Sequence, residues 1–154
     1  MVEWSVVAAL ILILAVVFMH KVRAVQRQAE LAAVHSTLGA LRTALVFQHL
    51  QSQTQHASKA AVVAVTQHNP FELLARRPGN YWGEVASTNA LVIPPGSWVF
   101  DSKCVCMGYL PQDATEFDSA SGDSMAWFHV SATAAGLLQI TPREAYVWQG
   151  VVLN

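Results

Sequence analysis

Glu3 is the residue near the chain start whose chemistry stands out. It is the only acid among residues 1–19, which otherwise hold one hydroxyl, Ser5, and apolar side chains. A carboxylate inside a membrane costs on the order of a few kcal/mol unless it is paired or protonated, so an acid in a spanning segment is a candidate for function. So close to the chain start, it could instead lie among lipid headgroups at little cost. The residues alone leave both interpretations open.

Cys104, Cys106 and His129 are the one set that could supply a nucleophile and a base. No acid or glycine-rich elbow frames them, so we expect that the chain is not an enzyme. On a strand, both cysteine side chains would point to the same face, and their spacing is poor for a disulfide between separate segments. Zinc would need further ligands at spacings that the sequence lacks. We therefore expect a half-buried pair on a strand.

Two other groups of polar residues are weighed as metal ligands. Three histidines, His49, His56 and His68, fall in or near a Gln- and Ser-rich stretch, where imidazoles are more often solvated. Residues 111–124 hold four acids, but their order does not fit the twelve-residue calcium loop. We expect a solvated acidic loop over Asp113–Asp123, and neither a metal nor a cofactor.

The first element that positions these residues is an apolar segment. Nothing polar interrupts residues 6–18, and the run stops at His20, Lys21 and Arg23. At a rise of ~1.5 Å per residue, residues 1–19 would reach roughly 28 Å, which nearly matches a ~30 Å hydrocarbon core. Residues 1–21 are predicted to form a membrane-inserting helix.

The apolar pattern then changes period without a break. Apolar residues recur at three- and four-residue steps, and no proline occurs before position 50; the recurring residues are Leu31, Val34, Leu38, Leu41 and Leu45. Residues 22–51 are therefore predicted to be an amphipathic continuation, which gives one long helix from about Glu3 to about Leu50. The Gln- and His-rich residues 48–58 are expected to end the helix and act as a linker.

Residues 52–154 are predicted to form one small globular domain. Aromatic and β-branched runs bounded by turn residues predict strands at 97–101, 104–110, 125–132 and 145–153, with a shorter fifth strand at 137–140. The connections are too short for helical crossovers, so an antiparallel sheet is expected. Residues 69–84 are expected to form an irregular connecting loop, in which Asn69 and Pro70 start a short helix and a turn at 78–80 ends it. The fold class is α+β: a long N-terminal helix packed on a small antiparallel β-sheet domain.

The net charge of −1 conceals an uneven distribution. From Ser52 onward, five Lys or Arg residues face eight Asp or Glu residues. A nucleic-acid-binding surface needs clustered basic side chains, and no such cluster is visible. No nucleic-acid partner is expected.

This arrangement resembles the type IV pilin and type II secretion pseudopilin family. The opening Val2-Glu3-Trp4, followed by the apolar residues 8–17, looks like the family's short Phe-Thr-Leu-Val/Ile-Glu opening ahead of its apolar helix. A longer and looser set is similar to pseudopilin-like members: Asn69-Pro70-Phe71, Leu73-Leu74, Pro78, Asn80-Tyr81, Gly83-Glu84, Pro95-Gly96-Ser97-Trp98, Phe100-Asp101 and Tyr109-Leu110-Pro111. The lack of distant paired cysteines favours a minor or secretion-type member.

The resemblance implies a pilin fold and a structural subunit of a pilus-like filament or secretion pseudopilus. In the family, the acid pairs with the N-terminal amine of a neighbouring subunit, which implies that role for Glu3. Helix packing in the filament would then involve Val6, Leu10, Ile13 and Val17. The implied partners are further copies or other pilin-like subunits, an inner-membrane assembly platform, membrane lipid, and a prepilin peptidase if a leader exists.

The resemblance also implies a location: the bacterial inner membrane, crossed once with the C-terminal domain in the periplasm, or an extracellular filament. However, Lys21, Arg23 and Arg27 follow the apolar run, and the positive-inside rule would place that domain in the cytoplasm. The family's acid is the fifth mature residue, whereas here it is the third. If Met1 is the third mature residue, a basic leader explains both differences; if Met1 is the mature start, the pairing register differs.

The alternative function is a single-pass membrane protein whose extracytoplasmic domain binds a partner without forming a filament. Its contacts would be exposed tryptophans among Trp82, Trp98, Trp127 and Trp148, most of which are expected in the sheet core.

Overall fold

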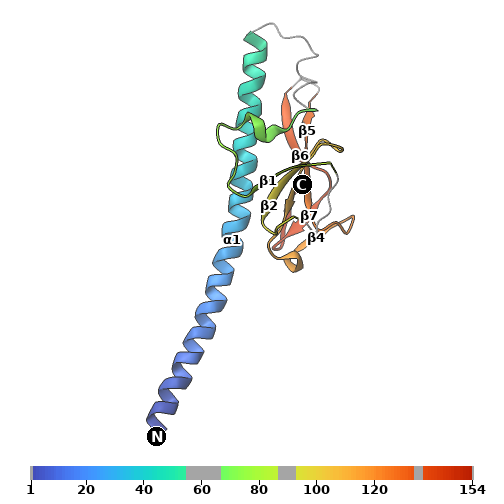
Figure 1. Ribbon diagram of the computed structural model, residues 1–154. Helices are drawn as coiled ribbons and strands as arrows, with labels where there is room; N and C mark the ends of the chain where they lie inside the picture. Colours follow the sequence, from blue (N-terminus) through green and yellow to red (C-terminus); the bar gives the residue numbers. More distant parts are fainter. Residues whose placement is uncertain (1, 55–66, 87–92, 134–136, 154) are drawn as a thin grey trace. The chain divides into compact units, whose positions relative to one another are not determined.

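The computed structural model describes residues 2–54, 67–86, 93–133 and 137–153 (Figure 1). The chain divides into two compact units, Met1–His35 and Ser36–Asn154. The first consists of the beginning of helix α1. The described residues of the second comprise the end of α1, two short 3-10 helices and eight strands in two sheets. The predicted α+β class, with a long N-terminal helix, is confirmed.

Helix α1 spans Val2–Thr54, in agreement with the predicted long helix. It continues past Leu50 into the expected linker because glutamine is a good helix former and no glycine or proline intervenes. The other linker residues, 55–58, lie outside the described residues. Within the second unit, α1 packs on the sheet, and Leu38, Leu41 and Leu45 are almost completely buried. The predicted apolar stripe is confirmed there.

The 3-10 helix η1 follows at Pro70–Leu73, where a short helix was expected. The Asn69 side-chain oxygen accepts a hydrogen bond from the Phe71 backbone N–H at 3.1 Å. Proline at the first helical position has no N–H to leave unpaired, and its fixed φ suits the turn. The predicted cap is confirmed.

The larger sheet has five strands in the order β1-β2-β3-β5-β6. Their bounds are Tyr81–Val85, Ser97–Asp101, Cys106–Leu110, Ala126–Ala132 and Leu138–Pro142. The pairs β2–β3, β3–β5 and β5–β6 are antiparallel, as predicted. The predictions for β1 were wrong in two respects. Its residues were expected in an irregular loop, and β1 pairs with β2 in parallel.

The smaller sheet has the order β4-β7-β8, with bounds Phe117–Ser119, Tyr146–Trp148 and Val151–Leu153. The prediction of one continuous strand over 145–153 was therefore wrong. Gln149 and Gly150 both have positive φ, 52° and 76°, which is the backbone of a tight hairpin turn. The chain reverses there, so β8 pairs antiparallel with β7.

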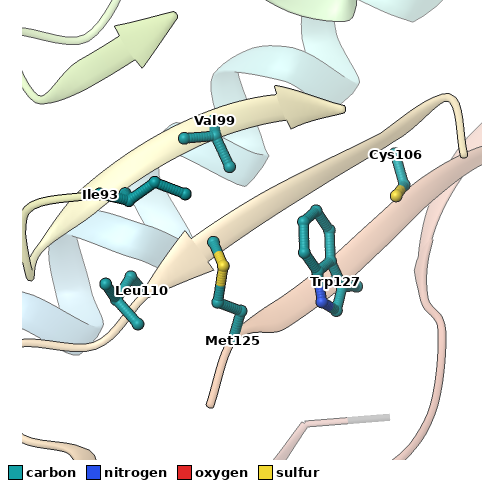
Figure 2. Packing of buried hydrophobic residues seen from close by; sticks show 6 residues of the cluster. All are labelled: Ile93, Val99, Cys106, Leu110, Met125 and Trp127. Carbon is teal, nitrogen blue, oxygen red and sulfur yellow. The ribbon is translucent and has the colours of Figure 1, made fainter. Parts of the chain in front are cut away.

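One face of the larger sheet carries a hydrophobic core cluster (Figure 2). Its buried members come from β2, β3, β5 and their flanks: Ile93, Val99, Cys106, Leu110, Met125 and Trp127. Gly108 lies between Val99 and Trp127 in register, and a Cβ there would come within 2.6 Å of the indole ring. The absence of a side chain at Gly108 therefore lets Trp127 lie against the sheet.

Replacing Gly108 by alanine is expected to destabilise the second unit by about 1–3 kcal/mol, because the new methyl group would overlap the Trp127 ring. Gly39→Ala is the matched control. Gly39 lies within α1 with open space around it, so alanine there should raise stability by about 0.5–1 kcal/mol. Chemical denaturation measures the free energy of unfolding, which should fall in Gly108→Ala and rise in Gly39→Ala. Equal changes in the two variants would contradict the close packing of Trp127 on Gly108.

Tyr146 joins the two sheets through its hydroxyl. The hydroxyl accepts a hydrogen bond from the Trp127 N–H at 2.9 Å and donates one to the Trp127 carbonyl at 3.1 Å. The side chain is fully buried, and this burial raises its pKa above the usual value of 10.0. One strand of the small sheet is thereby anchored to β5.

Tyr146→Phe is expected to cost about 1–3 kcal/mol at neutral pH, because it leaves the buried Trp127 N–H without its hydrogen-bond acceptor. The Trp127 carbonyl keeps its hydrogen bond from the Arg143 N–H at 2.8 Å. The raised pKa also predicts a pH effect. The unfolded tyrosine ionises near pH 10 while the folded one keeps its proton, so stability should fall as pH rises from about 10 through the folded pKa. Between pH 8 and 11, the denaturation midpoint should fall with rising pH less steeply for Tyr146→Phe than for the unsubstituted chain. Equal slopes would contradict the assignment of this pH effect to Tyr146.

Candidate functional site

The first candidate site is one face of the N-terminal part of α1. Positions 3, 6, 10, 13 and 17 alternate three- and four-residue steps, so they lie within about 80° of one another around the helix axis. We call this set, Glu3, Val6, Leu10, Ile13 and Val17, the 3–17 face. Its pattern of alternating steps is the one that lets parallel helices pack in register. The backbone thus places all five predicted assembly residues on one face.

The apolar members of the 3–17 face lie open in the single chain. The side chains of Val6, Leu10, Ile13 and Val17 are each more than half exposed. The rest of the segment is equally open, including Leu12 and Phe18. An uninterrupted apolar surface of this kind is costly in water, so it requires lipid or other helices around it.

By length and composition, α1 is the one helix in the described part of the chain that could cross a membrane. Segments near a chain start that act as signal sequences share these properties. Position 3 lies in the first turn of α1, where the aligned peptide dipoles favour a negative charge. The structure thus places Glu3 in a helical, apolar segment, on the same face as Val6.

The second candidate site is the turn between β2 and β3. The prediction that Cys104 and Cys106 form a pair on one strand was wrong, because β3 begins only at Cys106 and the two residues form a disulfide. Their Cα atoms lie 5.3 Å apart, closer than the roughly 6.6 Å expected two residues apart on a strand. Val105 between them has a φ of 55°, which bends the chain enough to bring the sulfurs together.

Asp101 supports this turn from the end of β2. Its carboxylate Oδ1 accepts hydrogen bonds from the backbone N–H groups of Lys103, at 2.8 Å, and Cys104, at 3.4 Å. Asp101 is itself almost completely buried. Sequence reasoning missed this role, although an aspartate at the start of a short connection is a known turn former.

The sheet also brings His129 to the disulfide. His129 lies directly opposite Cys106 in the β3–β5 register, and a cavity of about 320 Å³ is lined by Cys104, Cys106, His129 and Arg143. The His129 Nε2 atom is 3.2 Å from the Thr141 hydroxyl. The three residues weighed as a nucleophile and base thus do meet, but with the cysteines joined to each other. Arg143 was not foreseen, because it follows the last residue of β6 and is distant in sequence from the two cysteines.

Two of the four acids of residues 111–124, Asp113 and Asp123, accept hydrogen bonds from nearby groups. Asp113 caps the 3-10 helix η2, Ala114–Glu116, and accepts from the Thr115 N–H at 3.0 Å. The Asp123 carboxylate accepts from the Met125 N–H at 3.2 Å and from the Trp127 indole N–H at 2.7 Å. No group of three or more His, Cys, Asp or Glu residues that could hold a metal occurs in the described parts of the chain. His56 lies outside those parts.

Three of the four tryptophans weighed as partner contacts are buried, as expected. Trp98, Trp127 and Trp148 have at most 5% of their surface exposed, whereas Trp82 on β1 is 55% exposed. Because β1 is at the edge of the larger sheet, Trp82 is the one of the four that a partner could reach in the single chain.

Comparison with known proteins gives no relative: no protein-family model, no curated protein and no solved structure matches the chain.

Proposed function

We propose that the chain is a structural subunit of a pilus-like filament or secretion pseudopilus, of the type IV pilin kind, and that it assembles through its N-terminal helix without catalysing a reaction. The observation that carries the proposal is the exposure of Val6, Leu10, Ile13 and Val17, which share the 3–17 face with position 3. A lipid-facing helix needs only apolar residues, so an acid in line with the packing residues favours a contact between helices.

The architecture of the second unit supports the same proposal. Helix α1 is one continuous element that includes both the apolar N-terminal segment and the stripe buried against the sheet. In the proposed assembly, it connects the membrane to the folded domain. From Ser52 onward, eight acidic residues outnumber five basic ones, so this part of the chain carries a mildly acidic net charge. In the proposed assembly, the apolar helices form the interior and the sheet domain the outer surface.

The disulfide supports an extracytoplasmic place for the domain. Disulfides persist in oxidising compartments such as the periplasm and are rare in the cytosol. The Cys104–Cys106 bond therefore opposes the orientation that Lys21, Arg23 and Arg27 would give by the positive-inside rule. We propose the bacterial inner membrane as the site of insertion, with the domain in the periplasm or on an extracellular filament.

Immuno-electron microscopy of material sheared from producing cells tests the proposal. Antibodies against the second unit should label thin filaments, or a sedimentable assembly in the case of a pseudopilus, and cells lacking the gene should show no label. Recovery of the chain only as single membrane-embedded copies, with no assembly after overproduction, would contradict the proposal.

Exposed Trp82 favours one alternative, a single-pass membrane protein whose extracytoplasmic domain binds a partner without filament formation. Under that alternative, Trp82→Ala should abolish partner capture, and Glu3→Ala should have no effect. Under the filament proposal, Glu3→Ala should abolish assembly, and Trp82→Ala should have no effect. Cross-linked complexes of both variants, isolated from membranes, distinguish the two functions.

A further inference from the structure

We propose that the Cys104–Cys106 disulfide is a site of reversible thiol–disulfide exchange, which a dithiol reduces by attack at Cys104. The inference rests on the β2–β3 turn and its cavity, and it holds whether or not the chain forms filaments. Most disulfides of small domains join distant segments and are resistant to reduction. This one closes a ring around a single residue, Val105, so it adds little to the stability of the fold.

The two cysteines differ in their exposure to solvent. Cys104 is exposed in the turn, whereas Cys106 is only 4% exposed and belongs to the core cluster (Figure 2). Exchange requires in-line approach of a thiolate to one sulfur, and access decides which one is attacked. The incoming thiolate is therefore directed to Cys104, and Cys106 is the leaving group.

The backbone favours the reduced form locally. A β-branched residue at φ 55° is a strained conformation, and Val105 is held there while the cysteines are joined. Opening of the bond lets Val105 return to an ordinary φ. The rest of the hairpin is held independently, by the Asp101 hydrogen bonds and by the β2–β3 register from Ser97–Leu110 to Asp101–Cys106. Reduction therefore does not require the domain to unfold.

The cavity supplies space and charge for the reaction. It is lined by both cysteines, His129 and Arg143, and measures about 320 Å³. A cationic guanidinium near a sulfur favours the thiolate over the thiol. Arg143 thus favours both the approach of an anionic thiolate and the departure of the Cys106 thiolate.

The exchange balances as two displacements. In the first, a thiolate of the dithiol forms a bond to the Cys104 sulfur, the Cys104–Cys106 bond breaks, and its electron pair leaves on Cys106, which takes a proton from water. In the second, the other thiolate of the dithiol attacks the first dithiol sulfur and releases the Cys104 thiolate. Two electrons pass from the dithiol to the protein, and the dithiol leaves as a disulfide.

Single-cysteine variants of the full chain test the direction of attack. With oxidised glutathione as the probe, Cys106→Ser, which keeps Cys104, should take up one glutathione per chain. Cys104→Ser, which keeps buried Cys106, should react at least tenfold more slowly. Intact mass spectrometry measures both rates. Equal rates, or faster reaction of Cys106, would overturn the proposed attack at Cys104.

Titration of the unsubstituted chain with dithiothreitol tests exchange without unfolding. Reduced cysteines are trapped by alkylation and counted by mass, while tryptophan fluorescence reports the folded core. Both thiols should appear with unchanged fluorescence. If the bond opens only as fluorescence is lost, the disulfide is a structural link and the proposal fails.

Val105→Asn tests whether the strained backbone at Val105 favours the reduced form of the two cysteines. Asparagine tolerates positive φ, so the oxidised form should become about three- to tenfold harder to reduce at equilibrium. Ser102→Asn in the same turn is the matched control, because Ser102 does not have a positive φ. A shift of equal size in both variants would contradict the role of Val105.

Discussion

Glu3→Ala is expected to abolish filament assembly while the second unit stays folded. In the proposed filament, the Glu3 carboxylate lies in an environment of low dielectric and pairs with the N-terminal amine of a neighbouring subunit. Removal of one partner of a buried ion pair costs about 3–5 kcal/mol, because the other charge is left uncompensated. A loss of that size raises the subunit concentration needed for assembly by roughly a hundredfold or more. Counting of filaments per cell by electron microscopy measures the effect.

Two further variants separate charge from polarity. Glu3→Gln keeps the size and hydrogen-bonding atoms but removes the charge, and should assemble as poorly as Glu3→Ala. Ser5→Ala removes the other polar side chain of the segment and should assemble normally. All variants must show equal membrane insertion and a protease-resistant domain. Normal filament number and length in Glu3→Ala would remove Glu3 from the assembly mechanism.

Trp98→Ala is expected to destabilise the second unit by about 3–5 kcal/mol, a large part of the stability of a domain of this size. Trp98 is 1% exposed and lies at the centre of an aromatic cluster. Its ring centroid is 5.7 Å from that of Phe71, 4.9 Å from Tyr109 and 6.1 Å from Phe128. The substitution would leave a cavity that joins η1, β2, β3 and β5.

Trp82→Ala is the matched control for that loss, because Trp82 is 55% exposed on the edge strand β1. Hydrogen exchange of peptides covering β2 and β3 should accelerate by about a hundredfold or more in Trp98→Ala, since each 1.36 kcal/mol is a factor of ten. It should change little in Trp82→Ala. Similar acceleration in both variants would show that the aromatic cluster is not the source of stability.

The long helix and most strands could be predicted because their patterns are local. The apolar run and the stripe at Leu38, Leu41 and Leu45 need only helical periodicity, and α1 extends over both. Strand β2 matches its predicted bounds at Ser97–Asp101 because the proline-glycine turn before it and the Asp101 turn after it delimit the run. Local propensity and tertiary packing agree in these segments.

The remaining features depend on long-range pairing or on single backbone angles. The alternation in β1 is short and interrupted by Gly83, and only its pairing with β2 makes it a strand. The break between β7 and β8 depends on positive φ at Gln149, a residue that seldom marks a hairpin turn. The disulfide depends in the same way on Val105, whose β-branched side chain normally indicates a strand.

Zero-length cross-linking of native membranes or sheared filaments tests the central claim most directly. A carbodiimide joins a carboxylate to an amine only where the two are in contact. We predict a cross-linked peptide in which Glu3 of one copy is joined to the N-terminal residue of another, absent in Glu3→Gln. The mass of that peptide also identifies the mature N-terminal residue. Assembled filaments in which Glu3 is never joined to a second copy, or chains that remain monomeric under all conditions, would contradict assembly through the 3–17 face.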